Sequence, residues 1–274
     1  MKWDCSTLAF RWHPLDVALN AIADLGFQYA DIGSLKGDCE HLDPTRLSQK
    51  EVANLRETLQ SFELRLSSLN IRFGSYNDPC AEVRDRQVAW TKASMDIARA
   101  LDASIVTTTT GDELEWQSRK DALGLIVPRI KECVKYGRER GVSLALEMPH
   151  KHSLARNIQE TIGIIPFLSD GSEAVPITLD TSQVIHGGDS LADALKHLGN
   201  MIAHVHLRDA RGKYTRVAPG RGEVNFGEFI NGTKELGYQG VYAIEFEVDE
   251  YLSTDLELTK KGLRETRDYL NSVA

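Results

Sequence analysis

The sequence lacks the long apolar run of a membrane protein and the leader of a secreted one. No stretch approaches the roughly 18 consecutive apolar residues of a membrane span. The opening segment, MKWDCSTLAFRWH, has no apolar signal-peptide core. The four cysteines are far apart and form no CxxC pair, as is typical of reduced thiols inside the cell. We therefore expect a cytoplasmic protein with no membrane partner.

Positive charge and nucleotide-binding motifs are also scarce. The formal net charge is −8, whereas a nucleic-acid-binding protein usually presents a basic face. We therefore expect no nucleic-acid partner. The chain has no GxGxxG motif, no linker and no low-complexity tract, so we expect residues 1–274 to form a single domain. A homo-oligomer is left open.

The chain alternates strand-like with helix-like segments from end to end. The eight expected strands are Trp3–Ala9, Tyr29–Gly33, Leu64–Ile71, Ser104–Thr109, Ser143–Glu147, Ile177–Asp180, Ala203–His206 and Val241–Phe246. The expected helices are Pro14–Leu25, Ser48–Phe62, Val83–Ala100, Trp116–Arg140, Ile158–Leu168, Leu191–Leu198, Phe226–Leu236 and Leu256–Leu270.

This alternation indicates a parallel sheet covered by helices. Eight such units in 274 residues favour closure into a single (β/α)₈ TIM barrel, which has about 30 residues per unit, over an open doubly wound sheet. The least regular stretch, Asp209–Asn225, is rich in Arg and Gly. It follows the seventh strand, so we expect a loop that overhangs the C-terminal rim.

Four ligand-type residues end four successive apolar runs: Glu147 in LALE, Asp180 in ITLD, His206 in AHVH and Glu245 in YAIE. They are 33, 26 and 39 residues apart, close to the pitch of a barrel. Active sites of such barrels are built at the C-terminal ends of the strands. The spacing therefore predicts a divalent-metal site at this rim.

Two points about this set are open. Strand alternation places Glu247 on the same face as Glu245, so Glu247 is a second choice for the last ligand. Buried carboxylates must be paired, bind metal or stay protonated. The competing interpretation is therefore a network of salt bridges that plugs the barrel mouth, with the arginines Arg208, Arg211, Arg216 and Arg221.

Three carboxylates and one imidazole form an oxygen-rich set that suits Mn²⁺, Mg²⁺ or Co²⁺, and Zn²⁺ is an alternative although no thiolate favours it. One such ion, most simply Mn²⁺, could hold two adjacent oxygens of a sugar and stabilise an enediolate. A carboxylate beside the substrate could then move the proton on carbon, a role that typically contributes about 10²- to 10⁴-fold.

The segments LALEMPH, ITLDTSQ, AHVHLRD and RVAPGRGEVNF resemble the xylose isomerase-like TIM barrel family. That family includes sugar phosphate isomerases and epimerases, ketose 3-epimerases, inosose-processing enzymes and the apurinic endonuclease. The resemblance covers nearly the whole chain. It implies the same four metal ligands, with Glu147 and Glu245 as the acid–base pair, and it assigns Arg216 to substrate oxygens.

The chain departs from the family at one position. Many members have His three residues after the strand-six Asp, where this chain has Gln183. Gln can hydrogen-bond a hydroxyl group but cannot titrate near neutral pH. Four further residues follow strand ends and are candidate substrate contacts: His150, Trp12, His13 and Trp116.

These residues predict a metal-dependent isomerase or epimerase of a small sugar, ketose or polyol. The runner-up is a lyase on the same scaffold, such as an inosose dehydratase or a glycoside-cleaving enzyme, because both reactions begin by removing a proton next to a carbonyl. Two less favoured alternatives are an apurinic endonuclease and a barrel that binds without catalysis. The endonuclease needs histidines where this chain has Asn70 and Thr107–Thr110.

Overall fold

Eight parallel strands close into a barrel in this computed structural model, which describes residues 1–169 and 174–274. The barrel strands are β1 (Trp3–Ser6), β2 (Tyr29–Leu35), β4 (Arg65–Arg72), β5 (Ile105–Thr109), β6 (Ser143–Glu147), β7 (Ile177–Asp180), β8 (Ile202–Leu207) and β11 (Tyr242–Ile244). Neighbouring strands are consecutive around the ring, and β1 closes it by pairing with both β11 and β2. The predicted (β/α)₈ barrel is confirmed.

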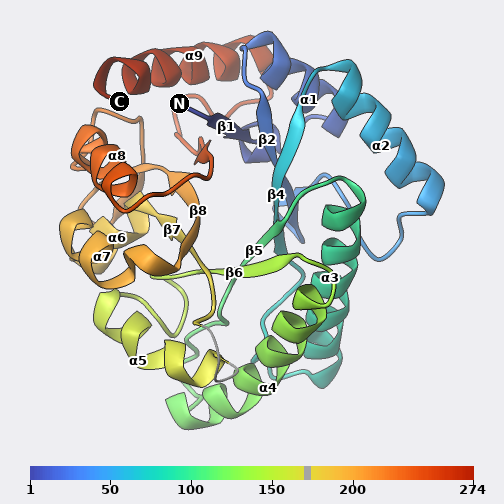
Figure 1. Cartoon of the computed structure of the whole chain (residues 1–274), viewed down its shortest axis with the longest axis vertical. Coiled ribbons are helices and arrows are strands. Elements are labelled where there is room, and N and C mark those ends of the chain that lie inside the picture. Colours follow the sequence, from blue (N-terminus) through green and yellow to red (C-terminus); the bar gives the residue numbers. More distant parts are fainter. Residues whose placement is uncertain (170–173) are drawn as a thin grey trace.

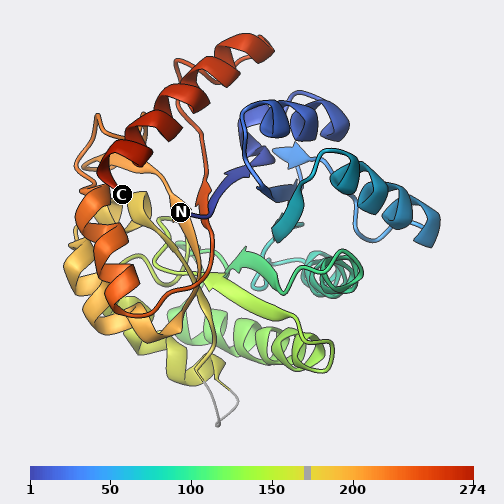
Figure 2. The same cartoon turned by 45° about the horizontal axis from the view of Figure 1, so that its top comes forward.

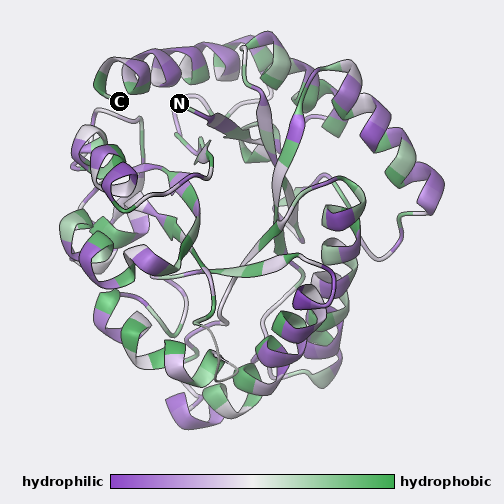
Figure 3. Ribbon diagram, in the orientation of Figure 1, coloured by the Kyte–Doolittle hydropathy of each residue, from purple (hydrophilic) through white to green (hydrophobic). Residues whose placement is uncertain are grey.

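Helices form the outer ring around these strands (Figure 1). They are α1 (Leu15–Asp24), α2 (Gln49–Ser61), α3 (Ala81–Ala100), α4 (Arg119–Arg138), α5 (Ile158–Leu168), α6 (Thr181–Gly187), α7 (Leu191–Leu198), α8 (Phe226–Glu235) and α9 (Leu256–Val273). Hydrophobic and hydrophilic residues alternate along them (Figure 3), as expected of helices that bury one face. The two chain ends lie close together (Figures 1 and 2). Within the described ranges, no helix combines the length and apolarity needed to cross a bilayer.

Part of the barrel interior is polar rather than aliphatic. Ser6 Oγ donates to Asp31 Oδ1 at 2.9 Å, and Ser68 Oγ also donates to Asp31. Thr107 and Thr178 share a hydrogen bond of 2.6 Å between their hydroxyl groups. Because buried polar groups need partners, these bonds between strands allow a barrel to hold polar side chains beneath its rim.

Three local differences from the sequence expectations have physical causes. The first strand ends at Ser6, not Ala9, because the Ser6 side chain accepts from Leu8 N and starts a 3₁₀ helix, η1 (Thr7–Phe10). The helix α6 was not predicted; it begins directly after Asp180, whose carboxylate caps it. The expected loop Asp209–Asn225 contains a two-stranded hairpin, β9 (Asp209–Arg211) with β10 (Tyr214–Val217).

The remaining short elements are β3 (Cys39–Glu40), which pairs antiparallel with β2, and the 3₁₀ helix η2 (Gly199–Met201). The last strand is shorter than expected and ends at Ile244, so Glu245 lies one residue beyond it.

Two glycines of α4 provide a stability test within one helix. A Cβ at Gly124 would meet nothing within 4 Å, whereas a Cβ at Gly137 would lie 2.3 Å from the carbonyl oxygen of Val142. Gly124→Ala should therefore raise the free energy of unfolding by about 0.5–1 kcal/mol, because Ala restricts the unfolded chain and favours helix. Gly137→Ala should lower it by about 1–3 kcal/mol through overpacking. Thermal unfolding midpoints of the two variants, compared with wild type, decide this; equal shifts would contradict the packing of α4 against this turn.

Candidate metal centre

Three of the four predicted ligands meet at the C-terminal rim of the barrel. Glu147 ends β6, Asp180 ends β7, and His206 is the next-to-last residue of β8. One potential ligand atom from each lies within 4.8 Å of the others, and all three side chains are buried. Parallel strands in register bring these residues together, since Asp180 pairs directly with His206.

Glu245 joins this group from β11, on the other side of β8. Its Oε1 lies 3.8 Å from His206 Nδ1 and accepts a 3.0 Å hydrogen bond from Asn70 Nδ2. Glu247 is engaged elsewhere: it pairs with Arg208 Nη2 at 2.7 Å and with Arg11. The geometry therefore favours Glu245 over Glu247 as the fourth ligand, which stays a prediction.

A single buried arginine links the acidic groups. Arg208 Nη1 lies 2.8 Å from Glu245 Oε2 and 3.5 Å from Asp180 Oδ2. The salt-bridge interpretation is thus realised for Arg208 alone among the four arginines it named. In the rim hairpin, Arg216 pairs with Asp249, Arg221 pairs with Glu250, and Arg211 donates to the carbonyl oxygen of Arg221.

The charges at the rim shift the pKa values of the carboxyl groups in opposite directions. Burial raises the pKa of Glu147 well above its usual range, and the nearby Glu245 raises it further. Burial also raises the pKa of Glu245, to about 7, although Arg208 opposes the rise. For Glu247 the effect of burial is outweighed by Arg208 and Arg11, which lower its pKa to about 2.

The residues present fit a divalent cation. His206 is fully buried, yet neither ring nitrogen has a hydrogen-bond partner. Burial lowers the pKa of His206, so its ring is neutral at pH 7 and has a lone pair to offer. Within residues 1–169 and 174–274, the Glu147 carboxylate has no hydrogen-bond or ion-pair partner. A cation bound by Glu147, Asp180, His206 and Glu245 would satisfy these groups with the oxygen-rich set that Mn²⁺ or Mg²⁺ prefers.

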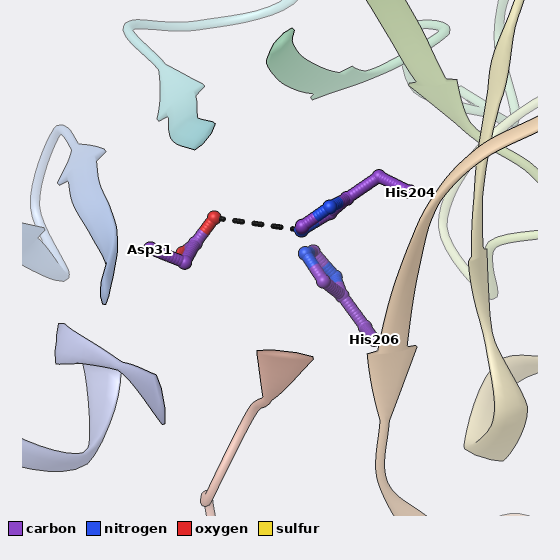
Figure 4. A group of neighbouring side chains, drawn as sticks. All are labelled: Asp31, His204 and His206. Carbon is purple, nitrogen blue, oxygen red and sulfur yellow. Dashed lines mark ion pairs between the residues drawn. The ribbon is translucent and has the colours of Figure 1, made fainter. Parts of the chain in front are cut away.

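A second group of potential ligands lies beside the first and shares His206. Asp31, His204 and His206 point toward one another, with Asp31 Oδ2 3.9 Å from His204 Nε2 (Figure 4). Ser68 Oγ already bridges this gap, because it donates to Asp31 and lies 3.2 Å from His204 Nε2. Asp31 and His204 are therefore already linked through Ser68, and His204 packs edge to face against His206 with ring centroids 5.1 Å apart. Sequence reasoning missed Asp31, although an acidic residue inside the apolar run YADIG was a usable signal.

A cavity of about 150 Å³ opens onto the candidate metal centre. It is lined by Glu147, Glu245, His150 and Arg208 together with Asn70, Arg72 and His152. Both expected acid–base carboxylates therefore line the same partly open cavity.

Of the six predicted substrate contacts, His150 lines the cavity, whereas the other five are not among its lining residues. Gln183 is buried and its carbonyl accepts from Lys151 N at 3.0 Å, which holds the loop after β6. Trp12 and Trp116 are exposed, by 52% and 64%.

Of the remaining two residues, His13 lies between η1 and α1, and Arg216 lies in β10. His13 has a buried ring nitrogen, Nε2, without a hydrogen-bond partner. Arg216 is 45% exposed and paired with Asp249. Their roles in substrate binding stay predictions.

The chain belongs to the xylose isomerase-like TIM barrel family, whose model matches residues 19–272. An uncharacterised protein of Methanocaldococcus jannaschii is 26% identical over 89% of this chain and 83% of its own length. An inosose dehydratase of Clostridium botulinum is 21% identical over 94% of this chain and 89% of its own. A D-psicose 3-epimerase of Enterocloster bolteae is 27% identical, but the match spans 43% of this chain and only 38% of that protein.

Solved structures share the same barrel over its whole length. A D-psicose 3-epimerase crystallised in the presence of D-fructose superposes with a TM-score of 0.79 at 16% identity, covering 100% of this chain and 99% of the other. The IOLI protein with a bound zinc atom gives a TM-score of 0.80 at 18% identity, with the same coverage.

Replacing Asp180 should separate the charge of this residue from its structural role. Asp180 Oδ1 caps α6 by accepting from Ser182 N and Gln183 N, and Asn caps helices as well as Asp does. Asp180→Asn should keep the fold but weaken Mn²⁺ binding by more than the roughly 10- to 100-fold that loss of an outer-shell partner costs. Isothermal titration calorimetry on chelator-treated protein measures this. Asp255→Asn, at the cap of α9, is the matched control; equal affinities in the two variants would rule Asp180 out as a ligand.

Metal affinity should also depend on pH. Because burial raises the pKa of Glu245 to about 7 and that of Glu147 well above its usual range, both carboxyl groups hold protons at pH 5 that a cation must displace. Mn²⁺ affinity should therefore rise from pH 5 through pH 7, and calorimetry in buffers of different ionisation enthalpy should show proton release. An affinity that does not change over this range, with no released proton, would contradict the assignment of these carboxylates.

Proposed function

We propose that the protein is a divalent-metal-dependent isomerase or epimerase that acts on a small sugar, ketose or polyol by proton transfer. The observation that carries this proposal is the position of Glu147 and Glu245, which face the same cavity beside Asp180 and His206. A divalent cation in this group, Mn²⁺ in the first instance, would polarise a substrate carbonyl and make the neighbouring C–H bond more acidic.

The two carboxylates have different surroundings, which suit different roles. Glu147 has no hydrogen-bond partner among the described residues and is the freer of the two to accept a proton from carbon. Glu245 is held in place by Asn70 and Arg208, so it is oriented to hold or return a proton at a fixed position. Both pKa values are raised, which brings these groups closer to the pH at which proton transfer is most effective.

Gln183 supports a substrate range that differs from that of the standard ketose 3-epimerases. It is buried at the start of α6 and its carbonyl oxygen is already engaged by Lys151 N. Its amide nitrogen remains a donor for a substrate hydroxyl. Gln183 could thus hydrogen-bond and orient a substrate hydroxyl, whereas a histidine at this position could also take up or release a proton.

The similar proteins support this class of chemistry. They include D-psicose 3-epimerases, which the proposal follows, and an inosose dehydratase aligned over 94% of this chain. That alignment makes a lyase the second candidate function. Both activities begin with the same proton removal, and they differ in whether the substrate carries a leaving group beta to the carbonyl. We also propose that residues 1–274 form one domain, consistent with a family match that reaches from residue 19 to residue 272.

Removing the charge of each candidate acid–base group should reduce turnover much more than substrate binding. Glu147→Gln and Glu245→Gln keep the shape of the side chain but cannot take up a proton. We expect each variant to lose about 10²- to 10⁴-fold in kcat, and to lose the uptake of solvent deuterium at the carbon next to the carbonyl. NMR of a panel of ketoses and inososes in D₂O with Mn²⁺ or Mg²⁺ measures both effects.

Glu40→Gln, which removes an exposed carboxylate paired with Lys36, controls for the change of one charge. Metal content is measured in parallel, because loss of the cation would also stop the reaction. Wild-type deuterium uptake in both site variants, with metal retained, would exclude these carboxylates as the proton-transfer groups.

A further inference from the structure

Arg72, an exposed residue at the cavity wall, has no carboxylate of the described residues within ion-pair distance, unlike most of the arginines near the barrel mouth. Arg208, Arg11, Arg216, Arg221 and Arg156 each form at least one ion pair with Asp or Glu. Arg72 lines the cavity, yet within the described ranges its guanidinium has no carboxylate partner within 4 Å. In a chain of net charge −8, a free guanidinium at a cavity wall is a position for an anion from outside the protein.

The fold holds Arg72 at this wall. Arg72 is the last residue of β4, and its carbonyl oxygen accepts a 2.7 Å hydrogen bond from Lys36 N. The next loop is tied to its neighbour, since Asp112 N donates to Ser75 Oγ at 3.0 Å and to Asn77 Oδ1 at 2.9 Å. The strand end and the loops beyond it therefore form one connected frame.

Two histidines complete the same side of the cavity. His150 and His152 both line it, and their rings meet edge to face with centroids 5.9 Å apart. The His152 carbonyl accepts from Glu113 N at 2.9 Å, and Ser153 bridges to Asp112, so this loop is anchored to the frame that carries Arg72.

These imidazoles offer N–H donors rather than further cations. Burial, with the nearby His152, Arg208, Lys151 and Arg72, lowers the pKa of His150 to about 3, so its ring is neutral at pH 7. His150 Nδ1 accepts from His152 N at 3.4 Å, which leaves the ring proton on Nε2 as a donor. Lys151 adds positive charge nearby, because the only hydrogen bond of its ammonium group among the described residues is to Thr215 Oγ1 at 3.4 Å.

We propose that Arg72, with His150 and His152, forms a subsite for an anionic group of the substrate, a carboxylate or a phosphate. All of these residues line one cavity. Glu147 and Glu245 would take the reacting carbons, while Arg72 would bind the anionic group and determine which substrates are accepted. This inference rests on the proposed function and narrows its substrate class to acidic sugars or polyols.

The closing experiment first measures anion binding without turnover. Protein saturated with Mg²⁺ is titrated with inorganic phosphate and, separately, with glycolate, and the imidazole C–H signals of His150 and His152 are followed by NMR. At least one anion should bind, and Arg72→Gln should weaken it about tenfold or more, as expected for loss of a charge-assisted hydrogen bond. Arg221→Gln, an exposed rim arginine paired with Glu250, should bind like wild type.

Comparing phosphate with glycolate shows which kind of anionic group the subsite binds. An effect of Arg72→Gln on phosphate alone indicates a phosphorylated substrate, and an effect on glycolate alone indicates a carboxylated one. If neither anion binds, the proposed subsite is wrong. It is also wrong if an anion binds equally well to wild type and to Arg72→Gln, because the anion would then be bound by the metal. Thermal unfolding midpoints establish that both variants are folded.

A turnover arm distinguishes failure of this subsite from failure of the proposed function. A ketohexose, its terminal phosphate and the corresponding ketohexuronate are each incubated with the Mn²⁺-loaded protein in D₂O. Deuterium uptake should favour an acidic sugar, with KM raised at least tenfold and kcat little changed in Arg72→Gln. Uptake from the neutral ketohexose alone, unchanged by Arg72→Gln, would overturn the subsite but leave the epimerase proposal standing. If no sugar exchanges, the proposed function fails, and the anion titration alone decides the subsite.

Discussion

Four carboxylates and two guanidinium groups are withdrawn from water at the mouth of this barrel, and the balance of their charges controls the rest of the site. Glu147, Asp180, Glu245 and Glu247 carry four negative charges when ionised, against two positive charges on Arg208 and Arg11. Isolated buried charges are strongly unfavourable. Burial, together with the neighbouring carboxylates, raises the pKa values of Glu147 and Glu245 and so favours their protonated forms. A divalent cation would bring these six side chains to neutrality.

Polar side chains inside the barrel, hydrogen-bonded to one another, accompany the buried charges at its rim. Asp31 and His204 form a hydrogen-bonded group with Ser6 and Ser68. This group lies beside His206, whose ring packs edge to face against His204 with centroids 5.1 Å apart. The strands fix the direction of each ligand, while Arg72 lies at the end of β4 and His150 lies on the loop after β6.

Periodicity was sufficient to predict the barrel and the strand ends that bear Glu147, Asp180, His206 and Glu245, because alternation and repeat length are local properties of a chain. Other features depend on contacts between distant segments, which no local pattern reports. Arg208 could be named only as one of four arginines, since its selection depends on Glu245, 37 residues away. The capping of α6 by Asp180 and the interior role of Asp31 were missed for the same reason. The unpaired state of Arg72 is visible only when every nearby carboxylate has been placed.

The central claim is that Glu147, Asp180, His206 and Glu245 surround one divalent cation. The most direct test is anomalous diffraction from crystals of the protein grown or soaked with Mn²⁺. The account predicts one strong anomalous peak with all four side chains at coordination distances of about 2.0–2.6 Å. Absence of a peak at full Mn²⁺ saturation, or a peak held by Asp31 and His204 with Glu147 uninvolved, would contradict it.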